Sequence, residues 1–207
     1  MTEFPFETTY WTIRVHDEYG SSVYADPIRI KSGNVTAQVI ENITVGRKYN
    51  TIQRAIDNAG TGEEIVVGPG IYQYFEDIDF KGKALTLRST NPDDPVVVAA
   101  TVINGTGHGP VVTFSHAEDA NSVLAGFTIT GGNAGIYCSG TSPLITSCNI
   151  VGNIGAGIEL HDGSNPAITY CDIVSNTGSG LAMLDILGGR NIIYNKPAIT
   201  NCLIAEN

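Results

Sequence analysis

Three stretches of this sequence are near-copies of one another: SPLITSCNIV at residues 142–151, NPAITYCDIV at residues 165–174 and KPAITNCLIA at residues 196–205. Each copy places a proline before a short apolar run and a cysteine between two isoleucine-containing segments. The cysteines of successive copies are 23 and 31 residues apart. A recurrence of about 20–30 residues that joins short strands through turns is typical of a coiled β-solenoid.

The copies also predict which side chains stack from one coil to the next. The cysteines occupy equivalent positions, so we expect a column of small buried thiols: Cys148, Cys171 and Cys202. A metal site is the alternative, but no histidine or second cysteine stands at ligand spacing beside them. An asparagine follows each copy at a bend: Asn153, Asn176 and Asn207. Because asparagine can adopt a left-handed backbone there and bond its side-chain amide to the next coil, we expect these residues to form a hydrogen-bonded ladder.

The segment before the repeats predicts a helix and then a strand. Apolar residues of the stretch YNTIQRAIDNA, at residues 49–59, recur at helical spacing, with Asn50 or Thr51 as the cap and Gly60 as the end. The stretch GEEIVVGPGIY follows at residues 62–72. Together they closely resemble the N-terminal segment of right-handed parallel β-helix proteins of the pectin-lyase-like superfamily. The resemblance implies that the helix covers the open end of the coil and that the strand begins its first turn.

The expected fold class is therefore all-β: a right-handed, single-stranded parallel β-helix with a short N-terminal capping helix and an N-terminal β-hairpin. Early coils are expected to take their strands from residues 84–87, 96–98, 111–114 and 123–129. In the later coils three strands align, and side chains along a strand point alternately inward and outward. This alternation predicts that one inward row is Ile136, Ile158 and Leu181, and that a second, two positions later, is Cys138, Leu160 and Met183. The eight extra residues at 184–191 are expected to form an outward loop.

The first part of the chain has a different pattern. Residues 8–30 alternate apolar and polar side chains around a turn-rich centre, which predicts a β-hairpin. This hairpin resembles the last two strands of a fibronectin type III-like sandwich. Residues 31–41 have the composition of a linker. We therefore expect residues 1–44 to be a hairpin and linker, the remnant of such a sandwich, and residues 45–207 to be the β-helix.

The sequence also suggests that the β-helix is C-terminally truncated, because it stops at Asn207 without a segment that would cover the last coil. An uncovered coil exposes unpaired backbone groups above an apolar core and favours edge-to-edge pairing. The expectation is a homo-oligomer formed through this end of the solenoid or through the N-terminal hairpin. We expect such a piece to belong to a larger extracellular or cell-surface protein, although residues 1–10 carry no signal-peptide pattern.

Charge restricts the partners. The formal net charge is −10, which disfavours nucleic acid and anionic lipid because both need a positive surface. No apolar run is long enough for a membrane helix. Polysaccharide is the expected partner class, and an anionic polysaccharide would need divalent cations to bridge it to this chain.

Candidate catalytic residues gather on one later coil. Glu159, His161 and Asp162 lie within four positions, with Asp185 one coil on and Asp172 on another strand. Glycoside hydrolysis needs paired carboxylates, which these residues supply, whereas a solvated loop edge is the competing interpretation. The lyases of the superfamily use a basic residue, which the resemblance does not locate here. No lyase, hydrolase, esterase or epimerase signature of the superfamily is matched residue by residue.

Acidic pairs in loops are the candidates for metal binding, since Ca²⁺ prefers several oxygen ligands. They are Asp77 and Asp79 with Glu76, Asp93 with Asp94, and Glu118 with Asp119. Solvated loop carboxylates are the alternative. His108 and His116 lie in turn-like regions, and the sequence gives neither of them a partner. No cofactor is required by this pattern, and Ca²⁺ is the one ion that it suggests.

Three functions stay open at this point. The first is a non-catalytic β-helix module of a larger surface protein, associated with carbohydrate or structural. The second is part of a polysaccharide lyase or hydrolase, which would need a groove with clustered carboxylates, a cation and a basic residue. The third is a self-assembling element that acts through the open solenoid end. The unmatched catalytic signatures favour the first.

Overall fold

The computed structural model describes residues 39–74, 77–184 and 194–207, together with the strand backbone at residues 10–11, 14–16, 22–24, 28–29, 186–188 and 191–193. The chain divides into two compact units, Met1–Ala37 and Gln38–Asn207. The expected boundary after residue 44 is therefore too late. The reason is that residues 40–42 form a strand of the second unit, paired with residues far ahead in the chain.

The first unit contains the expected hairpin pairing. Strand β2 (Arg14–His16) is antiparallel to β3 (Ser22–Tyr24), and β1 (Tyr10–Trp11) is antiparallel to β4 (Ile28–Arg29). The relation of this hairpin to a fibronectin type III-like sandwich stays a prediction.

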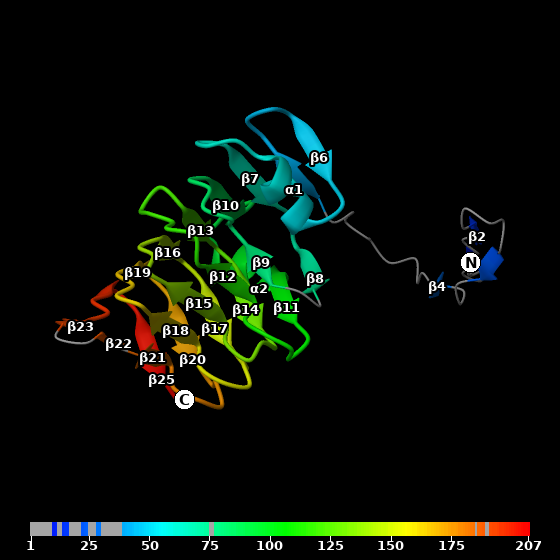
Figure 1. Ribbon diagram of the computed structural model, residues 1–207. Helices are drawn as coiled ribbons and strands as arrows, with labels where there is room; N and C mark the ends of the chain where they lie inside the picture. The colour runs from blue at the N-terminus through cyan, green and yellow to red at the C-terminus, as the bar shows by residue number, and fades with distance from the viewer. Residues whose placement is uncertain are drawn as a thin grey trace. The chain divides into compact units, whose positions relative to one another are not determined.

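In the second unit, successive coils contribute strands to three sheets (Figure 1). Sheet I has the order β6 (Arg47–Tyr49), β5 (Ile40–Asn42), β7 (Glu64–Val67), β10 (Thr86–Ser89), β13 (Val123–Ala125), β16 (Leu144–Thr146), β19 (Ala167–Thr169) and β24 (Ala198–Thr200). Sheet II has the order β8 (Gly70–Tyr74), β11 (Thr101–Gly105), β14 (Thr128–Thr130), β17 (Asn149–Val151), β20 (Asp172–Val174) and β25 (Leu203–Ala205). Sheet III has the order β9 (Ile78–Asp79), β12 (Val112–Phe114), β15 (Ile136–Ser139), β18 (Ile158–His161) and β21 (Leu181–Leu184). Neighbouring strands are parallel except where β5 meets β6 and β7, so the unit is a parallel β-helix.

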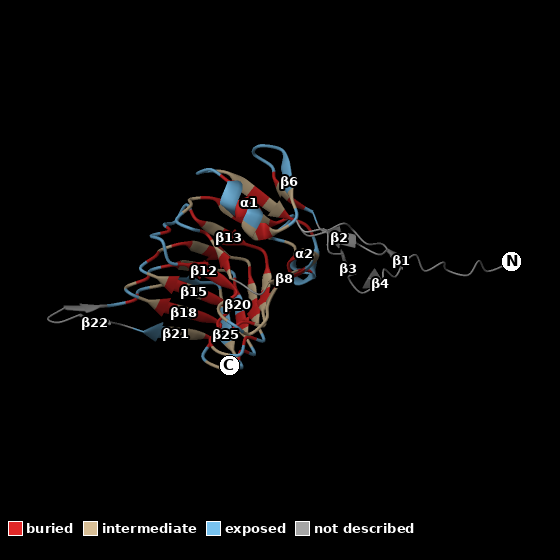
Figure 2. Cartoon of the chain, turned by 45° about the vertical axis from the view of Figure 1, so that its right-hand side comes forward, coloured by how far each residue is buried: buried red, intermediate tan, exposed pale blue. Residues whose placement is uncertain are grey.

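Buried residues recur on successive strands of the solenoid (Figure 2), and their side chains form one hydrophobic core cluster. In sheet III the inward column runs through Val112, Ile136, Ile158 and Leu181, as the alternation predicts. In sheet II the isoleucines of the three copies stack as Ile150, Ile173 and Ile204. Full burial of such a side chain contributes about 1.5–3 kcal/mol, so a repeated column stabilises every coil in the same way.

The predicted cysteine column is confirmed. Cys148 and Cys171 are fully buried, Cys202 is partly buried, and all three are free thiols at the corner between sheets I and II. The backbone N–H of Cys171 donates to Sγ of Cys202 over 3.4 Å. Hydrogen bonding with Cys148 and burial both raise the pKa of Cys171. The two fully buried thiols therefore pack as small side chains within the core cluster.

The asparagine ladder is also confirmed. Asn153 Nδ2 donates to Asn176 Oδ1, and Asn176 Nδ2 donates to Asn207 Oδ1, each over 2.9 Å. One detail differs from the expectation, because the left-handed backbone belongs to the residue before each asparagine: Gly152, Ser175 and Glu206. The reversal at that residue turns the following asparagine inward to its carbonyl partners.

Helix α1 (Ile52–Asn58) covers the first coil with its buried face of Ile52, Ala55 and Ile56. Thr51 is the N-cap, as predicted, and its hydroxyl accepts from the N–H of Arg54. The helix ends directly before Gly60, as predicted, with Ala59 as its C-cap. Lys83 Nζ donates to the carbonyl groups at this end, those of Ile56, Asp57 and Ala59, over 2.7–2.9 Å.

One expected strand and one expected loop need comment. Residues 96–98 are not a strand but part of α2 (Pro95–Ala100). The Asp94 side chain caps this helix by accepting from the N–H of Val96 over 2.9 Å, and proline at its first turn favours helical backbone. Where an outward loop was expected, at residues 184–191, the described strand backbone forms an antiparallel pair, β22 (Ile186–Gly188) with β23 (Asn191–Ile193).

Candidate functional site

The outward face of sheet III carries the predicted catalytic candidates. Glu159 and His161 are alternate residues of β18 and face away from the core. The register of β15 with β18 places Tyr137 beside Glu159 and Ser139 beside His161. The side chains of two coils therefore meet on one surface.

Contacts within this cluster are polar and aromatic. His161 Nε2 is 3.6 Å from Glu159 Oε2, and the rings of Tyr137 and His161 are 4.9 Å apart. The Ser139 hydroxyl donates a hydrogen bond to the carboxylate of Asp162. The structure thus brings Glu159, His161 and Asp162 into one cluster and adds two residues that sequence reasoning missed.

The other two members of the expected catalytic group do not complete it. Asp185 lies outside the described residues. Asp172 belongs to β20 of sheet II and is exposed at a different part of the surface. Strands β9, β12, β15, β18 and β21 of sheet III carry no lysine or arginine. These strands therefore supply no basic residue of the type used by uronate lyases.

A groove lies on the opposite part of the coil, where α2 faces the corner between sheets I and II. Its volume is about 330 Å³. The groove combines apolar and polar lining residues, among them Pro92, Asp93, Val98, Asn149, Tyr170 and Asp172. Gly126 allows the segment before α2 to approach this corner, because a Cβ at its φ of +78° would meet Cα of Pro92 at 2.6 Å.

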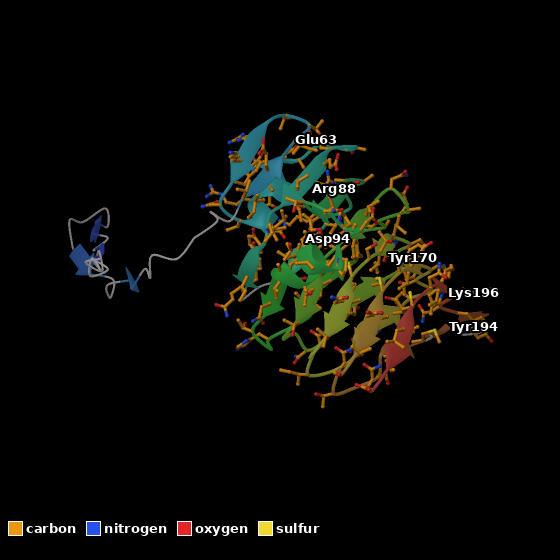
Figure 3. The ribbon with its side chains drawn as sticks, turned by 180° about the vertical axis from the view of Figure 1, so that it is seen from behind. Glu63, Arg88, Asp94, Tyr170, Tyr194 and Lys196 are labelled. Carbon is orange, nitrogen blue, oxygen red and sulfur yellow. The ribbon has the colours of Figure 1, made fainter. Side chains whose placement is uncertain are left out.

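Tyr170 is the aromatic residue of this groove (Figure 3). The residue is 64% exposed, and its φ of 52° is in the left-handed region that a bulky residue rarely adopts. The N–H of Tyr170 donates to the carbonyl of Thr200 over 3.1 Å, and the next residue, Cys171, is buried in the core. The ring is therefore held outward by a fixed backbone. The equivalent residues of the neighbouring copies are Ser147 and Asn201.

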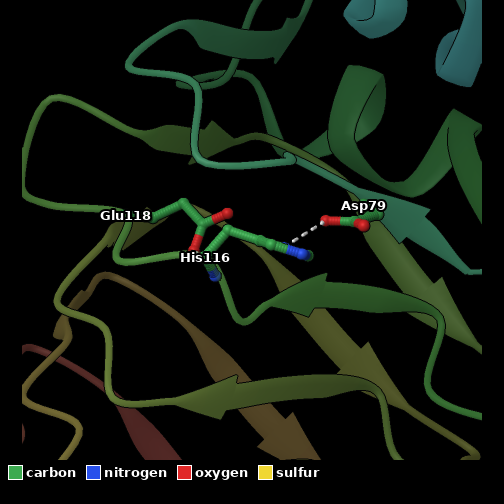
Figure 4. A group of neighbouring side chains, drawn as sticks. All are labelled: Asp79, His116 and Glu118. Atoms are coloured by element: carbon green, nitrogen blue, oxygen red, sulfur yellow. Dashed lines mark hydrogen bonds and ion pairs between the residues drawn. The ribbon is translucent and has the colours of Figure 1, made fainter.

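The predicted metal candidates separate into different places. Asp93 lines the groove, and Asp94 is occupied as the cap of α2. Asp77 lines a second hollow that also contains His108. Asp79 meets His116 and Glu118, with its Oδ1 3.5 Å from His116 Nδ1 (Figure 4). The sequence analysis named all three of these residues, but it did not predict that the coils bring them together.

The comparisons with known proteins agree with this architecture. Residues 65–207 match the family described as right handed beta helix region. A cell surface glycoprotein of Methanothermus fervidus is 33% identical over 126 residues, which are 59% of this chain. The chain spans only 18% of the length of that relative. No solved structure matches the chain.

The family match covers most of the parallel coils and agrees with the direction of their winding, since parallel crossovers are right-handed. None of the helices in the described part of the chain is both long and apolar enough to cross a bilayer. Strand order, register, core columns and family match all lead to the same assignment. This chain belongs to the right-handed β-helix family, in agreement with its resemblance to the pectin-lyase-like superfamily.

Proposed function

We propose that this chain is a non-catalytic β-helix module of a cell-surface protein and that it binds neutral carbohydrate in the groove beside Tyr170. The observation that carries the proposal is the exposed ring of Tyr170 on a fixed left-handed turn. Aromatic rings offer the apolar faces of sugars a flat surface, and a ring already fixed in place loses little entropy on binding.

The polar residues of the groove suit hydroxyl groups. Asp93 and Asp172 supply acceptors, and the side-chain amide of Asn149 supplies both a donor and an acceptor. A volume of about 330 Å³ lies at the lower end of the range of small-ligand pockets. It is suited to one or two sugar rings of a longer glycan.

The negative charge of the chain favours some classes of glycan over others. The chain has a net charge of −10, and two carboxylates line the groove itself. A uronate polymer would meet like charge there, which disfavours its binding. A neutral glycan is therefore the ligand class that we propose.

The surface location rests on the relative named a cell surface glycoprotein, which matches over 126 residues. A β-helix in such a protein presents a long, regular face, and a shallow groove on that face can engage neighbouring glycans. In this proposal the solenoid is a spacer as well as a binding surface.

Screening the 207-residue chain against neutral oligosaccharides of glucose, mannose, galactose and N-acetylglucosamine tests the proposal, with polygalacturonate as the anionic comparison. Calorimetric titration of the best neutral probe should give saturable binding, and Tyr170→Asn should weaken it about 10-fold or more. Asparagine suits the left-handed backbone, so this variant removes the ring and keeps the turn.

Ser175→Asn is the matched control, because Ser175 has a φ of 55° at the next corner of the same coil and is not among the groove residues. Binding by this control should equal that of the parent chain. Equal binding by Tyr170→Asn, or saturable binding of polygalacturonate alone, would contradict the proposal.

A second candidate function is polysaccharide cleavage on sheet III. The observation in its favour is that His161 Nε2 is buried beside Glu159 without a hydrogen-bond partner among the described residues. A histidine beside a carboxylate is a common general acid or base. Incubation with uronate polymers, with and without Ca²⁺, would reveal lyase activity as new absorbance from carbon–carbon double bonds. Its loss in His161→Gln would assign the activity to this cluster.

A further inference from the structure

Asp79, His116 and Glu118 form a compact group of three ligand-type side chains at the first two coils (Figure 4). Each offers one ligand atom, and these atoms all lie within 4.8 Å of one another. Asp79 ends strand β9, while His116 and Glu118 lie in the loop after β12. The group is separate from the groove beside Tyr170 and from the Glu159–His161 cluster.

The backbone holds this group in place. Glu118 is 2% exposed, and its two carboxylate oxygens accept from the N–H groups of Gly82 and His116, each over 2.8 Å. Gly82 permits this approach, because a Cβ at its φ of +71° would stand 2.9 Å from the carbonyl oxygen of His116. Asp79 is fixed by the N–H of Lys81, which donates to its Oδ1 over 2.8 Å. The carboxylates therefore do not depend on a bound ion for their orientation.

The charge of the group is not balanced by a permanent cation. Among the described residues, no lysine or arginine forms an ion pair with Asp79 or Glu118. Lys81 is nearby in sequence, but its Nζ pairs with Asp57 over 2.8 Å. A buried carboxylate without a cationic partner is costly. The two N–H groups offset part of that cost and leave further lone pairs free on each oxygen.

Thr113 is a fourth polar residue beside this group. Thr113 pairs in register with Asp79 and faces the same outward side of sheet III, between the core residues Val112 and Phe114. Thr113 is only 8% exposed, and its hydroxyl makes no hydrogen bond to the described residues. A buried hydroxyl of this kind usually has a partner. A metal-bound water beside Asp79 would provide one.

We propose that Asp79, His116 and Glu118 bind a divalent transition cation of the Zn²⁺ type, with a bound water next to Thr113. One imidazole and two carboxylates form a ligand set that Zn²⁺ accepts, and three protein ligands leave the fourth position for water. Ca²⁺ is disfavoured because it takes six or more oxygen ligands and no imidazole. The site would join the first coil to the second, and it is independent of the carbohydrate proposal.

Calorimetric titration of the chelator-treated chain with ZnCl₂ tests the site. The parent chain should bind one Zn²⁺, and its melting temperature should rise with the metal, since a ligand of the folded state stabilises it. His116→Ala and Asp79→Asn should each weaken binding at least 10-fold and lose the thermal shift. Glu118→Gln is a poorer test, because Glu118 also orders the Gly82 and His116 backbone.

His108→Ala is the control, because His108 is an exposed histidine whose Nδ1 interacts with Thr106 and is not part of this group. It should bind Zn²⁺ as the parent chain does. Co²⁺ in place of Zn²⁺ reports the ligand type, and its spectrum should show no thiolate charge-transfer band. Zn²⁺ binding that survives both His116→Ala and Asp79→Asn, a thiolate band, or no binding at millimolar Zn²⁺ would overturn the proposal.

Discussion

The side-chain amide of Asn153 donates to Oδ1 of Asn176 over 2.9 Å, although the two residues are 23 positions apart. The same oxygen also accepts from the backbone N–H of Asn153 over 3.1 Å. One amide group thus satisfies two donors of the coil before it. Its own Nδ2 continues the pattern by donating to the carbonyl of Ile150 and to Asn207.

Asn176→Ala should therefore be among the most destabilising single changes in the later coils. It removes the acceptor of the buried Asn153 N–H and a donor to the carbonyl of Ile150, at about 1–3 kcal/mol for each of these two groups, whereas Asn153 Nδ2 keeps the carbonyl of Ile129. We therefore expect a total loss of about 2–6 kcal/mol in the free energy of unfolding by urea. Thr177→Ala, at the exposed neighbouring position, should change that free energy by less than about 0.5 kcal/mol. Equal effects of the two substitutions would mean that the ladder is not a stabilising element.

Lys83→Met should destabilise the first coil. Its ammonium group binds three carbonyl groups at the end of α1, and charge-assisted hydrogen bonds contribute about 1.5–3 kcal/mol. Lys81→Met is the comparison, since Lys81 forms an exposed pair with Asp57 that is worth about 0–1 kcal/mol. Thermal unfolding should show a clear decrease in melting temperature for Lys83→Met only. A decrease of the same size in both variants would argue against a capping role.

The buried thiols should make the fold sensitive to alkali. Burial raises the pKa of Cys138 to about 12, whereas an unfolded cysteine titrates near pH 8.5. The unfolded chain loses this proton first, so the stability linked to Cys138 is complete below about pH 8.5 and decreases as the pH rises toward 12. Urea unfolding between pH 7 and pH 10 should show the decrease, and Cys138→Ala should make it smaller. An unchanged slope in that variant would assign the pH dependence to other groups.

The rate at which a reagent labels each cysteine should follow the exposure of its thiol. Cys138, Cys148 and Cys171 are buried, and Cys202 is partly accessible at the last described coil. A thiol reagent at pH 8 should modify Cys202 first and the others only as the chain unfolds. Mass spectrometry of the labelled peptides gives the order. Early labelling of Cys148 or Cys171 would contradict the stacked column.

Tyr170→Asn should not destabilise the chain, and it should stabilise it by up to about 1 kcal/mol. Tyr170 adopts a left-handed backbone that is unfavourable for a bulky side chain, and asparagine tolerates it better. Ser147→Asn changes the equivalent position of the preceding coil and should act in the same direction. Denaturant unfolding measures both. A destabilisation of more than 1 kcal/mol by Tyr170→Asn would show that its ring packs on the fold rather than serving the groove.

The sequence was sufficient to predict the repeating part of the fold. Columns such as Cys148–Cys171–Cys202 and Asn153–Asn176–Asn207 are visible because each coil repeats the same inward pattern. The helix beginning after Thr51 was predictable for a similar reason, since its cap and apolar spacing are local.

The two wrong predictions of the fold concern parts of the chain outside the repeated copies. Residues 96–98 are β-branched and suggested a strand, but the Asp94 cap and Pro95 favour a helix. The boundary of the second unit was placed too late because β5 pairs with β7, a contact that no local pattern shows. Local rules thus failed where capping or a distant partner decided the structure.

The candidate sites were only partly predictable. Glu159, His161 and Asp162 were found because they are neighbours in sequence. Asp79 and His116 come together through the register of β9 with β12. The sequence analysis therefore named each of them separately and did not predict that they form one group. Tyr170 was missed because outward positions vary between copies. Its aromatic side chain at a turn position where the other copies have serine and asparagine was the available signal.

Mapping amide chemical shifts while the chain is titrated with its best neutral oligosaccharide tests the central claim most directly, because it locates the ligand on the surface. We predict saturable shifts at Tyr170 and Asp172, at Asn149 and along α2, with little change at sheet III. Shifts centred on Tyr137, Glu159 and His161, or no shifts with any neutral probe, would contradict the account.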